Sequence, residues 1–145
     1  MFKHILLPTD GSDLSAGTIK EGIRLAKSIG AKVTGLCVMP LQFALFVEME
    51  IPAQALEQAI KRCKEVAETY LAGIEKQAKE RGVTCDAVYE RSDYPYEAII
   101  RVAEQNGCDL IMMATHGRRG VGALVIGSET QKVLTHSKIP VLVYR

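Results

Sequence analysis

The 145-residue sequence contains no tryptophan, only three phenylalanines, and no apolar run long enough to cross a bilayer. Its four cysteines show neither a CxxC pair nor metal-ligand spacing, so neither a zinc module nor a disulfide framework is expected. The net charge of +1 gives no overall attraction to nucleic acid or to an anionic membrane. P-loop and dinucleotide-binding signatures are missing too, which leaves kinase and dehydrogenase functions without support.

What is present is typical of a globular protein, with 48% hydrophobic and 24% charged residues. The length suits one domain over residues 1–145 with a sizeable core. The first residues lead directly into a strand pattern, without the apolar region of a secretory signal. We therefore expect a cytoplasmic protein whose thiols are reduced and mostly buried.

Strand and helix patterns alternate along the whole chain. Strands are predicted at 4–9, 32–39, 83–89, 109–115 and 139–144, and the segment 40–52 is predicted to be irregular. Three predicted helices end at a glycine shortly before a strand, namely Gly30, Gly82 and Gly107. This pattern predicts an α/β fold with a doubly wound, five-stranded parallel sheet and helices on both faces. The strand order that we expect for it is 3-2-1-4-5.

Helical spacing also predicts the inward face of the long helix that ends at Gly82. Its expected core residues are Ala59, Cys63, Val66, Tyr70 and Ile74. The first and fourth strands are apolar throughout, as central strands covered on both faces are. Pro140 fits only an edge position, which places the last strand at the edge of the sheet.

Polar, glycine-bearing segments follow the first and fourth strands, at 8–12 and 116–120. If these strands are neighbours, the two segments face each other across a cleft where the winding of the sheet reverses. Asp10 is suited to accept a hydrogen bond from an adenine amine or a ribose hydroxyl. The glycines, two arginines and a helix N-terminus at Ser128 are suited to phosphate. Ser128 and Gln131 have capping-box spacing, which supports a helix beginning at Ser128.

These segments resemble those of the universal stress protein (UspA-like) family. The similarity runs through the strand ending in Pro8-Thr9-Asp10-Gly11-Ser12, through Ala114-Thr115-His116-Gly117 and Gly127-Ser128, and through the final Ile139-Pro140-Val141-Leu142-Val143. The resemblance implies a regulatory stress-response protein that binds ATP, with Mg²⁺ as a companion ion, and hydrolyses it slowly at most. It also implies a homodimer built on the strand at 139–144, since an exposed edge strand invites pairing.

The family's ATP-binding members carry Gly, two residues, Gly, nine residues, and then Gly-Ser or Gly-Thr. Gly117 and Gly127-Ser128 match the second part of this motif, whereas Ala114 replaces its first glycine. An alanine costs about 1 kcal/mol or more if the backbone there needs a positive φ, and almost nothing in an extended strand. Glu129 either competes with phosphate for the helix N-terminus or simply complements the helix dipole.

We expect the nucleotide to contact Pro8, Thr9, Asp10, Val38, Ala114, His116, Gly117, Arg118, Arg119, Gly120, Gly127, Ser128, Glu129 and Thr130. Some of these have simpler alternatives: Asp10 as a turn residue, and one of Arg118 and Arg119 as plain surface charge. His116 has no nearby serine, cysteine or carboxylate to complete a nucleophilic arrangement, so we expect it to line the site. No catalytic residue and no metal ligand is assigned.

The segment 41–51 is unusually apolar for a connection. It is interpreted as a loop that folds over the core or into a dimer contact. The alternatives are a mobile lid over the nucleotide and a patch for a partner protein.

Two other functions remain open. A family member without ATP would act purely by protein association, and Ala114 and Glu129 favour that possibility. An adenylating enzyme of the PP-loop kind is less favoured, because Asp10 puts a negative charge where that family needs a Ser-Gly-Gly nest for pyrophosphate.

Overall fold

Five parallel strands form one sheet in the order β3-β2-β1-β4-β5, which confirms the predicted topology. The computed structural model describes residues 1–116 and 126–145. The strands are β1 (His4–Thr9), β2 (Lys32–Met39), β3 (Cys85–Arg91), β4 (Leu110–Ala114) and β5 (Val141–Tyr144). The helices are α1 (Asp13–Ile29), α2 (Phe43–Glu48), α3 (Ala53–Glu80), α4 (Pro95–Gln105) and α5 (Ser128–His136).

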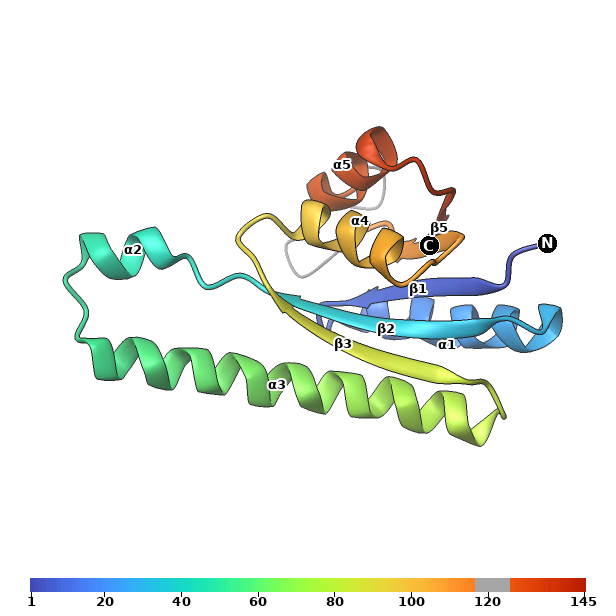
Figure 1. The fold of residues 1–145 in the computed structure, drawn as a ribbon, viewed down its shortest axis with the longest axis horizontal. Coiled ribbons are helices and arrows are strands. Elements are labelled where there is room, and N and C mark those ends of the chain that lie inside the picture. Colours follow the sequence, from blue (N-terminus) through green and yellow to red (C-terminus); the bar gives the residue numbers. More distant parts are fainter. Residues whose placement is uncertain (117–125) are drawn as a thin grey trace.

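Helices cover both faces of this sheet (Figure 1). On one face, Ile5 and Leu7 of β1 belong to a core that α1 and α3 complete. On the other face, Leu6 packs in a second core with residues of α4 and α5. Successive side chains of a strand point to opposite faces, so a strand with helices on both sides is apolar at every position. This arrangement explains the unbroken apolar runs of β1 and β4.

The predicted helix ends agree with the structure. Gly30 is the C-cap of α1 with φ +70°, and its N–H donates to the carbonyl of Ala26. Gly82 and Gly107 have the same left-handed conformation after α3 and α4. Glycine adopts this conformation without the steric cost that other residues meet.

Three sequence predictions need correction. The segment 40–52 is not irregular throughout, because it contains α2. The strand predicted at 83–89 lies at Cys85–Arg91, since the N–H of Val83 still donates to Ala78 at the end of α3. The last strand begins at Val141 instead of residue 139, after Pro140, which has no N–H to donate.

The long helix α3 is only partly a core helix. Its buried residues are Ala67, Leu71, Ile74 and Ala78, all in its second half. Val66, predicted to face inward, is 41% exposed. The first half of α3 and the whole of α2 extend past the carboxyl ends of the strands, where no sheet lies beneath them (Figure 1). We call residues 41–66 the arm.

None of the helices in the described part of the chain is long and apolar enough to cross a membrane.

Candidate functional site

The predicted neighbourhood of the first and fourth strands is confirmed. β1 pairs with β4 in parallel, with Ile5 beside Leu110 and Leu6 beside Ile111. Asp10 and Thr115, which follow these strands, therefore leave the same edge of the sheet. From this edge the chain continues to α1 on one face and to α5 on the other, so the winding reverses here. Gly117, Arg118, Arg119 and Gly120 lie outside the described residues.

The turn after β1 is held by its own side chains. Thr9 Oγ1 accepts a hydrogen bond from the N–H of Gly11 (3.1 Å), and Asp10 Oδ1 accepts from the N–H of Ser12 (2.9 Å). Ser12 is the N-cap of α1, and its Oγ accepts from the N–H of Ser15 (3.2 Å). Asp10 therefore has the structural role that the sequence left open, and Ser12 is confirmed as a cap.

Helix α3 packs directly on this turn. Gly11 has φ +78°, and a Cβ added there would lie less than 3.0 Å from the ring of Tyr70. Tyr70 was expected only as a core residue of a helix, so its position over the turn was missed. A hollow of about 230 Å³ adjoins the same place, between α1 and α3.

The beginning of α5 is fastened to the end of β4. The N–H of Gly127 donates to the carbonyl of Thr115 (2.6 Å), and Thr130 Oγ1 donates to the carbonyl of Ala114 (3.0 Å). The predicted helix beginning at Ser128 is confirmed, but Gly127 is the N-cap because its carbonyl accepts from the N–H of Gln131 (2.9 Å). The capping-box role of Ser128 was therefore wrong. The first N–H groups of α5, which have no partner within the helix, lie next to the end of β4.

Three further predicted residues lie at or near this edge. Pro8 pairs with Leu36, and Val38 packs against the core beneath α4 and α5; both are half-buried. His116 Nδ1 is 3.1 Å from Thr115 Oγ1. His116 Nε2 is buried, and no described residue offers it a hydrogen bond. A buried polar atom of this kind needs a partner, and a ligand is one candidate.

The thiols take no part in this arrangement. None of the four cysteines forms a disulfide bond, and burial raises the pKa of Cys85 and of Cys108 to about 11. A thiol with such a pKa is protonated at neutral pH and is a poor nucleophile. The described residues at the sheet edge offer hydrogen-bond donors and acceptors, which suit binding.

The model of the universal stress protein family matches residues 1–145. The chain belongs to the universal stress protein family. Among curated members, it is 32% identical to universal stress protein MJ0531 of Methanocaldococcus jannaschii, covering 100% of this chain and 83% of that protein.

Solved structures of the family share the fold. The structure of MJ0577 from M. jannaschii is 27% identical, covers 99% of this chain and 95% of its own, and superposes with a TM-score of 0.84. A universal stress protein in complex with cAMP (19% identical, TM-score 0.67) covers 99% of this chain and 97% of its own. Another universal stress protein, from Archaeoglobus fulgidus in complex with dAMP (14% identical, TM-score 0.65), covers 100% of this chain and 98% of its own. Some structural neighbours of this universal stress protein thus hold adenine nucleotides.

Ala114, the departure from the family's glycine motif, lies in ordinary strand. It is the last residue of β4 and pairs with Tyr144 of β5. The non-glycine residues with positive φ in the described ranges are Gln42 and Glu50. Alanine therefore meets no backbone conflict at position 114. Of the two alternatives raised by the sequence, the extended strand, in which alanine costs almost nothing, is the one observed.

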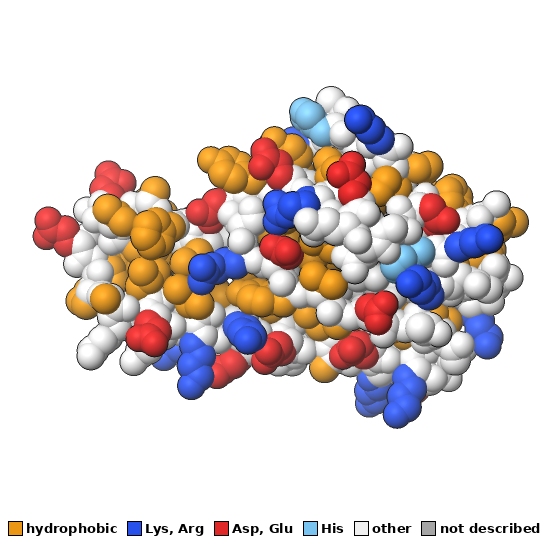
Figure 2. All heavy atoms as spheres, viewed as in Figure 1, with side chains coloured by type: hydrophobic (Ala, Val, Ile, Leu, Met, Phe, Trp, Pro, Cys, Tyr) orange, Lys and Arg blue, Asp and Glu red, His pale blue; other side chains and the backbone are white. Residues whose placement is uncertain are grey.

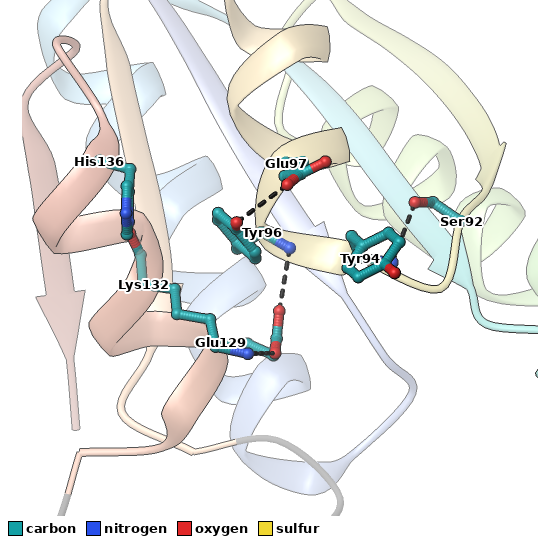
Figure 3. A network of polar contacts seen from close by, with 7 residues as sticks. All are labelled: Ser92, Tyr94, Tyr96, Glu97, Glu129, Lys132 and His136. Carbon is teal, nitrogen blue, oxygen red and sulfur yellow. Dashed lines mark hydrogen bonds and ion pairs between the residues drawn. The ribbon is translucent and has the colours of Figure 1, made fainter.

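Glu129 turns toward α4 instead of the first turn of its own helix (Figure 3). Its Oε2 accepts from the backbone N–H of Tyr96 (2.9 Å), and its Oε1 accepts from Lys132 Nζ (3.0 Å). Tyr96 lies in the first turn of α4, so the carboxylate complements the positive end of that helix. The sequence could not reveal this contact, which joins residues 33 positions apart.

Tyr96 connects the rest of this network. Its ring lies 5.4 Å from Lys132 Nζ and 5.4 Å from the ring of His136. Its hydroxyl donates to Glu97 Oε1 (2.9 Å), and this hydrogen bond raises the pKa of Tyr96. The network joins the N-terminal part of α4 to the outer face of α5, and so helps to fix the helix that begins at the candidate site.

Proposed function

We propose that this universal stress protein binds an adenine nucleotide, ATP together with Mg²⁺, at the edge of the sheet where β1 and β4 end. The observation that carries the proposal is the attachment of α5 to β4 through Gly127–Thr115 and Thr130–Ala114, beside the turn that holds Asp10. This attachment sets a helix N-terminus, which favours anions, next to an acidic turn, which favours hydroxyl and amine donors.

The polarity of the edge sets the direction of the nucleotide. The base and ribose lie toward Pro8, Thr9, Asp10 and Val38, whereas the phosphates lie toward Ala114, Gly127, Ser128, Glu129 and Thr130 at the start of α5. His116 Nε2, buried without a partner among the described residues, is available to the ligand. Gly117, Arg118, Arg119 and Gly120 complete the phosphate side in this proposal.

The neighbours with bound cAMP and dAMP support an adenine nucleotide as the ligand. The described part of the site offers no activated nucleophile, so hydrolysis of ATP is slow at most, and nucleotide occupancy acts as a regulatory signal. We place this activity in the cytoplasm, where free thiols stay reduced.

The protein acts as a homodimer through residues 139–144 in this proposal. β5 is an edge strand of the sheet, and its Leu142 and Tyr144 are 41% and 39% exposed. An exposed apolar edge is a template for pairing with another chain. The edge of a second copy would cover it.

A second function, association with protein partners without ATP, is favoured by Glu129. This residue puts a carboxylate in the first turn of the helix that would hold phosphate. Its hydrogen bond to Tyr96 turns the carboxylate aside, which is why we rank nucleotide binding first.

Titration calorimetry with Mg-ATP tests the proposal. Asp10→Ala should weaken ATP binding at least tenfold, because the ribose or base loses its acceptor, whereas Asp13→Ala, an exposed acidic residue three positions on, should leave binding unchanged. The protein has no tryptophan, so a co-purified nucleotide would also raise absorbance near 260 nm visibly. Absence of heat and of thermal shift with ATP, in a protein that stays dimeric, would favour association alone.

A further inference from the structure

The arm carries an apolar surface that its own chain does not cover. Phe43, Leu45, Val47 and Met49 are 53%, 45%, 63% and 68% exposed, and α2 has no buried residue. Figure 2 shows hydrophobic side chains gathered at this end of the molecule, over α2 and the beginning of α3. A cluster of exposed apolar side chains marks an interaction site in a folded protein.

This surface has a definite shape. Asp93 Oδ1 accepts from the N–H groups of Leu41 (2.9 Å) and Gln42 (2.7 Å), which fixes the base of the arm. At the far end, the N–H of Ile51 donates to the carbonyl of Phe46 (3.0 Å). Gln42 and Glu50, on either side of α2, both adopt a positive φ. Such a conformation costs about 1–2 kcal/mol in a residue with a side chain, and a short helix without a core cannot offset it alone.

The charged residues of the arm are grouped by sign. Three exposed acidic residues come first and three exposed basic residues follow, before the exposed Glu65: Glu48, Glu50, Glu57, Lys61, Arg62 and Lys64. The arm therefore has an acidic part around α2 and the beginning of α3, and a second part further along α3 in which basic residues outnumber the one acidic residue. In an antiparallel pair of identical arms, the acidic end of each lies against the basic end of the other. A two-fold symmetric contact is self-complementary in this way.

We propose that the arm is a docking surface for the arm of a second copy of this chain, paired antiparallel around a two-fold axis near Ala59. The apolar side chains of α2 leave water in this contact, and the opposite charges set its direction. An anionic membrane suits the surface less well, because the acidic residues flank the most exposed apolar ones. The arm follows β2 and leads into the second half of α3, whose buried residues pack on the side of β2 and β3, whereas β5 is the opposite edge of the sheet. The arm contact is therefore separate from the dimer proposed at β5.

Charge-reversal variants test the pairing by sedimentation equilibrium at low salt. All proteins carry Leu142→Glu, which puts a charge on the β5 edge and leaves the arm as the remaining contact. One variant adds Glu48→Lys, Glu50→Lys and Glu57→Lys, so that every charged residue of its arm except Glu65 is basic. The other adds Lys61→Glu, Arg62→Glu and Lys64→Glu, so that its arm is wholly acidic. Each should dimerise at least tenfold more weakly than the parent, because like charges meet across the axis.

Mixing the two variants in equal amounts should restore a dimer of about the parent's strength, since a basic arm then meets an acidic one. Charge reversal by Lys76→Glu and Lys79→Glu, at exposed positions in the second half of α3, is the matched control and should leave the strength of dimerisation unchanged. Far-UV circular dichroism confirms that every variant folds. A parent that stays monomeric, or a mixture that does not associate, would overturn the proposal. So would protection of the arm from protease by Mg-ATP in the monomer, which would identify a lid.

Discussion

The turn after β1 and the arm after β2 leave neighbouring strands at the same edge of the sheet, but they keep their shapes by different means. The turn is short and polar, and side chains within Thr9–Ser15 accept hydrogen bonds from three of its backbone N–H groups. The arm is long and apolar, and none of its residues from Leu41 to Val66 is buried. A turn that satisfies its own polar groups needs no partner, whereas exposed apolar groups gain free energy only when something covers them.

The functions that we propose for the two segments differ in the same way. The turn is held by its own hydrogen bonds and follows β1 beside the end of β4, where a small ligand needs preformed donors and acceptors. The arm extends away from the sheet and exposes apolar side chains, which suits contact with a second protein chain. The following predictions test this difference, beginning with the largest effect.

Truncation of a leucine to alanine should lower the stability of the protein strongly in the core and hardly at all in the arm. Leu36 of β2 is 0% exposed, and Leu36→Ala should lower the free energy of unfolding by about 2–5 kcal/mol through loss of burial and a cavity. Leu45 of α2 is 45% exposed, and Leu45→Ala should change the free energy of unfolding by less than about 0.5 kcal/mol. Urea unfolding at low protein concentration measures both. Equal losses would mean that the arm belongs to the core.

A methyl group should be costly in the turn. Gly11→Ala combines a left-handed backbone with a clash against Tyr70, and about 2–4 kcal/mol of stability should be lost. Gly17→Ala in α1 is the matched control: nothing lies within 4 Å of the added methyl, and helix propensity should raise stability by about 0.5–1 kcal/mol. A neutral Gly11→Ala would show that α3 does not press on the turn.

The contrast between turn and arm also explains which features were predictable from sequence. The strands at 4–9 and 32–39 agree with the structure residue for residue, and the helix beginning at Ser128 was also correct, because apolar runs or amphipathic patterns there are bounded by clear turn residues. The segment 41–51 lies between Pro40 and Pro52, but an apolar run does not tell whether a core lies beneath it. Its helix was therefore missed, and its exposure fits the alternative of a surface patch better than the interpretation as a loop over the core.

At the candidate site, the sequence located the two segments but not the contacts that define them. Asp10 and Ser128 follow recognisable motifs, and the adjacency of β1 and β4 followed from the strand order. The position of Tyr70 over Gly11 and the bond from Glu129 to Tyr96 join residues far apart in the chain. Such contacts depend on how α3 and α4 pack, for which one sequence carries no local signal.

Removal of the cap in the turn should have a moderate effect. Ser12→Ala leaves the N–H of Ser15 without its acceptor, and about 1 kcal/mol of stability should be lost. Ser28→Ala is the control: its exposed hydroxyl donates to Leu25 near the other end of α1, where no cap is lost. Thermal unfolding of both variants is the measurement. Similar shifts in Tm would show that the turn does not depend on its own side chains.

The smallest global effect is expected at the base of the arm. Asp93→Ala removes the acceptor for the N–H groups of Leu41 and Gln42, which are exposed and can bond to water instead. The free energy of unfolding should fall by less than about 1 kcal/mol, while limited proteolysis under native conditions should cut within residues 41–51 several-fold faster. Asp86→Ala, at an exposed position of β3, should leave the cleavage rate unchanged. If the protease cuts the Asp93→Ala variant at the same rate as the parent protein, the arm keeps its position without this anchor. Its order must then come from contacts along α3.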